Sequence, residues 1–219
     1  MAKKEAGLVR VTCRLRNRPG SPMLMNPATS EMLEQLFKPK EARKGREEDL
    51  TMDQVAASRV YRANGPESSI GFPIRNLLAN LVNAGRLVDH TGKMKLSTRE
   101  DSLVPGLLDF EKDFIAFNPR RTDLNFRTSA MRGRIPSNKV AVCIVRPEFR
   151  NWVTEDINFT FTPKDVPETK LRDELFYKGG KMIGLCDFRP SCKGPYGKYY
   201  VCYWKSEELD REPLEMDKE

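Results

Sequence analysis

One amphipathic segment limits the folds that are open to this chain. Between Pro73 and Gly85 the apolar side chains recur at the spacing of an α-helix. Proline is favoured in the first turn of a helix and glycine just after the last, so the segment predicts a helix with these two residues at its ends. Its apolar face consists of Ile74, Leu77, Leu78, Leu81 and Val82. A helix with one apolar face must bury that face, and we expect it to pack against a sheet.

Strand patterns surround this helix. Residues 8–16 alternate between apolar and polar side chains, which is the period of a half-buried strand. Residues 152–162 alternate in the same way, and residues 139–145 form an apolar run typical of a buried strand. The complete set of predicted strands is 8–16, 103–108, 114–117, 139–145, 152–162 and 198–204.

Two more helices are predicted. Residues 30–37 fit a short helix with Ser30 as its N-cap, and residues 165–183 fit a longer one with Asp165 as a possible N-cap. The buried side of the longer helix would consist of Val166, Leu171, Leu175, Phe176 and Met182. Residues 55–61 fit either a short helix or an edge strand.

The main elements run in the order strand, helix, strand, strand, helix, strand. This order predicts an α+β fold of the ferredoxin-like (RRM-like) kind, an antiparallel sheet with two packed helices and long basic loop insertions. We expect a single domain over residues 1–204, with insertions around 38–54 and 88–136. Residues 205–219 are predicted to form an acidic C-terminal tail.

The net charge is unevenly distributed. The 219 residues carry a formal net charge of +7, but residues 205–219 hold three basic and seven acidic side chains, so residues 1–204 carry +11. A body this basic favours a polyanionic partner, because each phosphate contact releases counterions. A solvated surface with a solubilising acidic tail is the alternative account.

Composition disfavours several other classes of protein. No apolar run approaches the length of a transmembrane helix, which predicts a soluble, cytoplasmic protein with no membrane partner. The five cysteines are scattered and His90 is the single histidine, so we expect no disulfide framework and no metal site. Cys143 and Cys202 lie in apolar strand patterns and are predicted to be buried, reduced thiols. No cofactor-binding motif and no catalytic constellation is present, so neither a cofactor nor a catalytic residue is predicted.

Arginine is concentrated in residues 118–138, which are predicted to form a loop. Residues 120–150 carry eight basic and two acidic side chains. Arginine interleaved with aromatic residues suits contacts to a nucleic-acid backbone together with base stacking, and a disordered basic excursion is the competing account. The candidate phosphate-binding arginines are Arg120, Arg121, Arg127, Arg132 and Arg134, joined by Arg16 and Arg18 from the first strand end and the loop after it.

Residues 179–204 combine a helix end, a glycine-rich loop and a strand. Glycine lets backbone N–H groups approach a ligand closely and take up positive φ, while cations and a tyrosine offer charge and a stacking face. The stretch predicts a phosphate clamp made of Arg189, Lys193, Gly194, Tyr196, Gly197 and Lys198. The alternative is a connection whose glycines only turn the chain.

Parts of the chain resemble a known family. The segments NGPESSIGFPIRNLLANLVNAGR and IGLCDFRPSCKGPYGKYYV resemble the RAMP superfamily, the RNA-binding subunits that form the backbone of CRISPR effector complexes. The DFRP and GPYG segments are also similar to a family of small phage and mobile-element proteins. The RAMP resemblance implies an RRM-like core whose loops grip a guide RNA.

The main hypothesis is a non-enzymatic protein that binds the phosphate backbone of single-stranded RNA or DNA, or of a guide RNA. It would act as a repeated subunit of a homo-oligomeric filament or of a ribonucleoprotein complex. One alternative is a metal-dependent nuclease whose carboxylates converge in the fold, with Asp187 as the first candidate. Another is a phage factor that binds a host protein.

Overall fold

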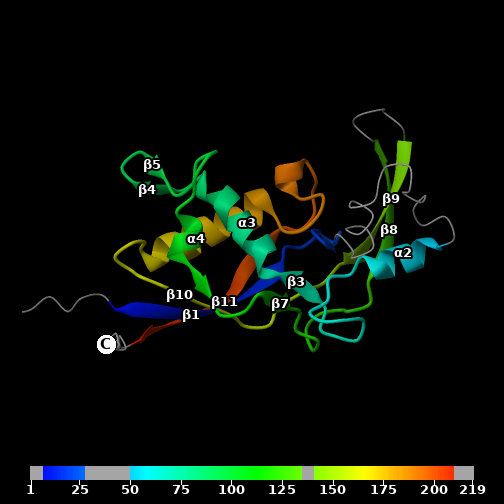
Figure 1. Ribbon diagram of the computed structural model, residues 1–219, viewed down its shortest axis with the longest axis horizontal. Coiled ribbons are helices and arrows are strands. Elements are labelled where there is room, and N and C mark those ends of the chain that lie inside the picture. Colours follow the sequence, from blue (N-terminus) through cyan, green and yellow to red (C-terminus); the bar gives the residue numbers. More distant parts are fainter. Residues whose placement is uncertain (1–6, 28–49, 135–140, 210–219) are drawn as a thin grey trace, which may run out of the picture.

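The computed structural model describes residues 7–27, 50–134 and 141–209. Its centre is an antiparallel sheet with the strand order β11, β1, β10, β6, and Figure 1 shows helices gathered on one side of these strands. The strands are β1 (Leu8–Asn17), β6 (Asp109–Phe110), β10 (Ile157–Phe161) and β11 (Tyr199–Leu209). The predicted α+β class is confirmed.

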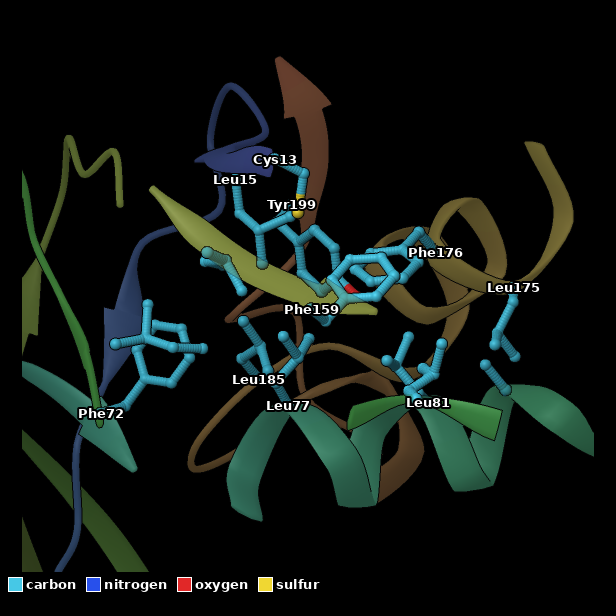
Figure 2. Close-up of a cluster of buried hydrophobic side chains, with 14 of the residues drawn as sticks. Cys13, Leu15, Phe72, Leu77, Leu81, Phe159, Leu175, Phe176, Leu185 and Tyr199 are labelled. Carbon is cyan, nitrogen blue, oxygen red and sulfur yellow. The ribbon is translucent and has the colours of Figure 1, made fainter. Parts of the chain in front are cut away.

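The predicted helix at residues 73–85 is confirmed as α3 (Ile74–Gly85), with Pro73 at the N-cap position. Leu77 and Leu81 are fully buried, and Figure 2 shows both directed from α3 toward Phe159 of β10. The remaining apolar residues of this face, Ile74, Leu78 and Val82, are partly buried and pack against the same core. The helix therefore covers the sheet with the face that its sequence pattern predicted.

The second predicted helix differs from the expectation. It is present over residues 168–183 but is mostly π-helical: η2 (Lys170–Phe176) and η3 (Gly179–Ile183) are joined by two α-helical residues, and both pack against α3. Asp165 precedes both in a turn closed by its N–H to the Thr162 carbonyl, so it caps neither, and Met182 is 51% exposed instead of buried. A π-helix winds with i to i+5 bonds, so residues placed by α-helical spacing rotate away from the core. Val166, Leu171, Leu175 and Phe176 are buried as predicted.

A second sheet contains β2 (Met23–Leu24), β9 (Ala141–Phe149) and β8 (Arg127–Arg134). β8 and β9 form an antiparallel hairpin that projects from the rest of the molecule (Figure 1). The loop predicted over 118–138 is therefore wrong for residues 127–134. Pairing with an apolar strand, as where Met131 lies opposite Ile144, stabilises an extended segment whose own composition does not indicate a strand.

Helix α2 (Met52–Ser58) packs on this hairpin through Val55 and Ala56. Of the short helix and the edge strand that the sequence allowed at residues 55–61, the structure therefore contains the helix. Thr51 and Gln54 form a capping box at its start. Residues 103–108 contain a short helix, α4 (Val104–Leu107), and not a strand, with Pro105 in its first turn, where proline is favoured. The helix predicted at 30–37 lies outside the described residues.

The other strand predictions are confirmed with changed boundaries. Residues 114–117 contain β7 (Phe114–Ala116), which pairs with β3 (Gly71–Pro73), and residues 152–162 contain only β10. The last strand continues to Leu209, which lies opposite Leu8 of β1, so the first part of the predicted acidic tail belongs to the sheet. A small hairpin of β4 (Asp89–Thr91) and β5 (Met94–Lys95) and the short helix η4 (Pro190–Cys192) complete the elements named in the described residues. No helix within these residues is both long enough and apolar enough to cross a membrane.

Candidate nucleic-acid interface

The face of the main sheet opposite the core is polar and largely neutralised by its own carboxylates. Val9, Val11, Cys13 and Leu15 of β1 point into the core. Successive side chains of a strand point to opposite faces, so the residues between these four and Arg16 after them point to the polar face. Arg10 forms an ion pair with Glu111 at 2.6 Å, and Arg14 forms one with Asp156. Across the edge strand, Lys205 is paired with Glu207. Most of this face therefore offers little unbalanced positive charge to a ligand.

The end of β1 is different. Arg16, Arg120 and Arg121 are exposed, and among the described residues their side chains have no hydrogen-bond or ion-pair partner. We call these three residues the arginine cluster. They are held together through Val153, which bridges to Arg16 on one side and accepts the Asn118 N–H at 2.8 Å on the other. Thr122 also donates to the Val153 carbonyl, at 3.0 Å, and anchors the turn that carries Arg120 and Arg121.

Arg16 and Arg121 lie close enough to the edge strand to affect a thiol on it. Partial burial raises the pKa of the Cys202 thiol of β11, and the positive charges of Arg16, Arg14 and Arg121 oppose that rise. Two of the three cluster residues therefore place positive charge beside Cys202 of β11.

Aromatic rings lie next to the arginine cluster. Tyr200 is opposite Arg16 in the β1–β11 register, and the Arg14 guanidinium lies 4.6 Å from the centre of the Tyr203 ring. A groove of about 520 Å³ along β11 is lined by both tyrosines and by Tyr177 and Trp204. Tyrosine rings beside cations are the surfaces on which bases of single-stranded nucleic acid stack.

The glycine-rich loop packs against its own backbone. A Cβ added to Gly194 would lie 1.7 Å from the Phe188 carbonyl oxygen, and one added to Gly197 would lie 2.0 Å from the Leu185 carbonyl oxygen. Gly197 has the expected positive φ of 70°, whereas Gly194 is not among the residues of positive φ. Close approach within the loop explains both glycines without a ligand.

Arg189 is bound to the loop that carries it. Its guanidinium donates to the Cys186 carbonyl at 2.5 Å and to Ser191 Oγ at 3.0 Å. Neighbouring Lys193 is exposed and adopts a left-handed conformation, and the ring of Tyr196 rests against Phe188. Among the described residues, the side chains of Lys193 and Lys198 have no hydrogen-bond or ion-pair partner, so they are the free cations of this loop.

The structure brings the loop to the turn that follows β1. The Arg18 N–H donates to the Lys198 carbonyl at 2.9 Å, and the Lys198 N–H donates to Ser21 Oγ at 2.9 Å. The Arg18 side chain donates to the Tyr199 carbonyl and lies 5.6 Å from the Tyr177 ring, so it is already engaged. Arg16, Arg18 and Lys198 thus lie on neighbouring segments.

The hairpin arginines lie on a separate element. Arg127 and Arg132 are exposed on β8, and Arg134 is at the end of that strand with its side chain outside the description. Among the described residues, nothing links their side chains to the arginine cluster. The structure therefore distributes the predicted site residues over three places: the end of β1, the glycine-rich loop and the hairpin.

Asp187, the carboxylate of the nuclease alternative, is engaged by protein groups. It accepts from Arg146 Nε at 2.7 Å and from the Phe188 N–H at 2.9 Å. Within the described ranges, no group of three or more histidine, cysteine, aspartate or glutamate side chains is placed to hold a metal ion.

Sequence reasoning missed Asn80, which connects the helix layer to the loop. It is 2% exposed and stands between Leu77 and Leu81 in the apolar face of α3. Its Nδ2 donates to the Gly179 carbonyl at 2.9 Å and to the Gly184 carbonyl at 2.7 Å, and its Oδ1 accepts from the Tyr199 hydroxyl at 2.8 Å. The sequence did contain a signal for Asn80, because a polar amide within the apolar face of a helix must find hydrogen-bond partners in the core.

The thiols are distributed differently from the prediction. Cys143 and Cys202 are exposed, as is Cys192, so the prediction that Cys143 and Cys202 are buried is wrong. An apolar strand pattern does not by itself show which face of the strand another layer covers. Cys13 and Cys186 are buried, and burial raises the pKa of the Cys186 thiol to about 12.

Alkylation of the native protein should therefore modify three cysteines and spare two. Cys143 and Cys192 should react first, and Cys202 more slowly because the pKa of its thiol is raised. Cys13 and Cys186 should react only after unfolding. Mass spectrometry of proteolytic fragments at timed intervals measures this order, and rapid labelling of Cys186 in the folded protein would contradict it.

Comparison with known proteins adds little to this geometry. No protein-family model and no curated protein matches the chain. Among solved structures, a chain of the "Cryo-EM structure of the Type III-B Cmr-beta bound to cognate target RNA" has 12% sequence identity and a TM-score of 0.49. The similarity covers 92% of this chain and 61% of that chain, so this chain spans less than two thirds of its neighbour's length. Similarity at this level establishes neither a shared family nor a shared activity.

Proposed function

We propose that this protein is a non-enzymatic binder of single-stranded nucleic acid that holds the phosphate backbone through the arginine cluster. One observation carries the proposal. Arg16, Arg120 and Arg121 are exposed without carboxylate partners in the described structure, whereas Arg10, Arg14 and Lys205, which share the sheet face of Arg16, are each paired with an acid. Unpaired guanidinium groups retain their donors for phosphate oxygens.

The neighbouring tyrosines fit a single strand better than a duplex. Bases that are free of a partner can stack on Tyr200 and Tyr177, which line the groove beside the cluster. Stacking and phosphate contacts are tolerant of sequence, so we expect weak dependence on base identity and strong dependence on salt. The loop cations Lys193 and Lys198 would extend the contact, and Arg127 and Arg132 on the hairpin would form a second, separate contact.

We also propose that the main sheet and its helices form a ferredoxin-like (RRM-like) fold. Along the chain the strands of the main sheet follow one another as β1, β6, β10 and β11, with helices after the first and the third of them, which is the strand–helix–strand–strand–helix–strand order. Across the sheet they are arranged as β11, β1, β10 and β6, which is the fourth, first, third and second strand in chain order. An order of this kind is expected of the ferredoxin-like arrangement and supports an RRM-like core. Together with the sequence resemblance to the RAMP superfamily, it favours RNA as the ligand and a ribonucleoprotein as the assembly.

Replacing the three cluster arginines with alanine should weaken binding to a labelled single-stranded oligonucleotide by about a hundredfold at low salt. The slope of log affinity against log salt should fall by about 2, because three phosphate contacts are lost. The melting temperature should change little, since these side chains have no protein partners among the described residues. Fluorescence anisotropy over a salt series, with RNA, DNA and duplex probes, measures the effect.

The matched control is the triple variant Arg10→Ala, Lys95→Ala and Arg150→Ala, which removes the same charge from side chains that are already ion-paired and do not line the β11 groove. It should lose much less affinity than the cluster variant. Equal loss in both triple variants would reduce the proposal to a general charge effect. Magnesium-dependent cleavage of any probe would contradict the non-enzymatic assignment and favour the nuclease alternative.

A further inference from the structure

The outer edge of β11 has no strand partner in the described part of the chain. β11 is the terminal strand of the main sheet and pairs with β1 on one side only. It is 11 residues long and contains no proline. Its far end runs beside the start of β1, away from the helices (Figure 1). An edge strand of this length presents a row of free backbone donors and acceptors that a second extended chain can pair with.

The sequence of this edge is complementary to itself. Tyr203, Lys205, Glu207 and Leu209 occupy one face of the strand, because they lie opposite Arg14, Thr12, Arg10 and Leu8 in the β1 register. If two copies pair antiparallel with Ser206 opposite Ser206, then Lys205 of each copy is opposite Glu207 of the other. In the same register, Tyr203 of each copy is opposite Leu209 of the other. Directly opposed residues on one face are the pairs that stabilise an antiparallel sheet.

We propose that this protein forms a twofold homodimer through the β11 edge, centred on Ser206, so that the two main sheets become continuous. A twofold axis satisfies both Lys205–Glu207 pairs at once, since the same edge meets itself. Within the described part of the single chain, Lys205 and Glu207 are exposed and form an ion pair with each other, so neither charge is committed to the core. Pairing begins at Tyr203 and leaves the Tyr177 and Tyr200 end of the groove open.

A second copy fits this edge better than nucleic acid does. Strand addition requires backbone N–H and C=O groups at the spacing of a strand, and a sugar–phosphate chain does not supply them. The edge carries both charge signs in a mirrored order, which matches an identical strand and not a uniformly anionic ligand. The proposal is independent of the nucleic-acid function and is tested without nucleic acid.

Single charge reversals test the dimer. Lys205→Glu places two glutamates opposite each other at both symmetric positions, and Glu207→Lys places two lysines there. We expect the parent chain to pass from monomer to dimer across the micromolar range by analytical ultracentrifugation, and each variant alone to remain monomeric. An equimolar mixture of the two variants should dimerise again. In the mixed dimer the introduced glutamate of one chain lies opposite the introduced lysine of the other, and the unchanged Glu207 and Lys205 lie opposite each other at the second position.

Both variants lose the Lys205–Glu207 pair within their own chain, so restored association in the mixture arises only from contacts between chains. The control reversals Lys95→Glu and Asp89→Lys break an exposed ion pair on the β4–β5 hairpin and should leave association unchanged. A parent chain that stays monomeric at all concentrations would overturn the proposal. Variants that still dimerise alone, or a mixture that fails to associate, would also overturn it.

Discussion

Asn80→Ala is expected to lower the free energy of unfolding by about 3 kcal/mol or more, which is large for a change of one polar side chain. The amide donates to the carbonyls of Gly179 and Gly184 and accepts from the Tyr199 hydroxyl, all within a buried region. Alanine leaves three polar groups without these partners, and a buried unsatisfied group costs about 1–3 kcal/mol. Because these contacts join α3, η3 and β11, the loss should loosen the start of the glycine-rich loop.

Chemical denaturation of Asn80→Ala beside Asn83→Ala separates this effect from helix propensity. Asn83 lies one turn further along α3, and the one partner of its side chain in the described structure is the Ala79 carbonyl of the same helix. Both variants gain the same intrinsic preference of alanine for helix, so their difference reports the buried contacts. Tyr199→Phe completes a double-mutant cycle with Asn80, and a coupling energy near zero would show that the hydroxyl contact is not important.

Gly194→Ala should be the second severe change, with a loss of about 3 kcal/mol or a rearranged loop. The added methyl group would lie 1.7 Å from the Phe188 carbonyl oxygen and 2.4 Å from its carbonyl carbon. The crowding atoms belong to the backbone, which cannot rotate aside as a side chain can. Gly194 is therefore required for two segments of the same loop to touch.

Alanine substitutions at two other glycines serve as controls for the loss of stability expected in Gly194→Ala. Gly106→Ala has open space and an ordinary φ, so it should be neutral or slightly stabilising in α4. Gly20→Ala also has open space but a φ of +72°, so it measures conformational strain alone, about 1–2 kcal/mol. Melting curves of the three variants should follow the order Gly106, Gly20, Gly194 in increasing damage. A Gly194→Ala protein as stable as Gly106→Ala would refute the packing account and restore a ligand as the reason for this glycine.

These two expectations change the interpretation of the glycine-rich stretch. Its glycines and Arg189 are explained by contacts inside the loop, and Asn80 fixes its start to α3. The loop then holds Lys198 beside the turn after β1 through backbone hydrogen bonds, and Lys193 is exposed on the same loop. Phosphate binding in this region would depend on those free cations and on the arginine cluster more than on glycine itself.

The sequence by itself determined the features that depend on local periodicity. The α3 helix, the inward face of β1 and the burial of Leu171, Leu175 and Phe176 follow from apolar spacing within single segments. The uneven charge and the element order that predicts an α+β class are also properties of the chain in one dimension. Such features need no knowledge of what lies across the fold.

The tertiary structure alone decided every feature that depends on a partner distant in sequence. Residues 127–134 became a strand because β9 lies beside them, and Met182 turned outward because the helix there is π-wound. Most importantly, the arginines are alike in the sequence, but Arg10 and Arg14 meet carboxylates more than 100 residues away. Arg16 and Arg121 meet none among the described residues. Ion pairing is a short-range property of three-dimensional neighbours, so only the fold separates neutralised cations from those left free to bind phosphate.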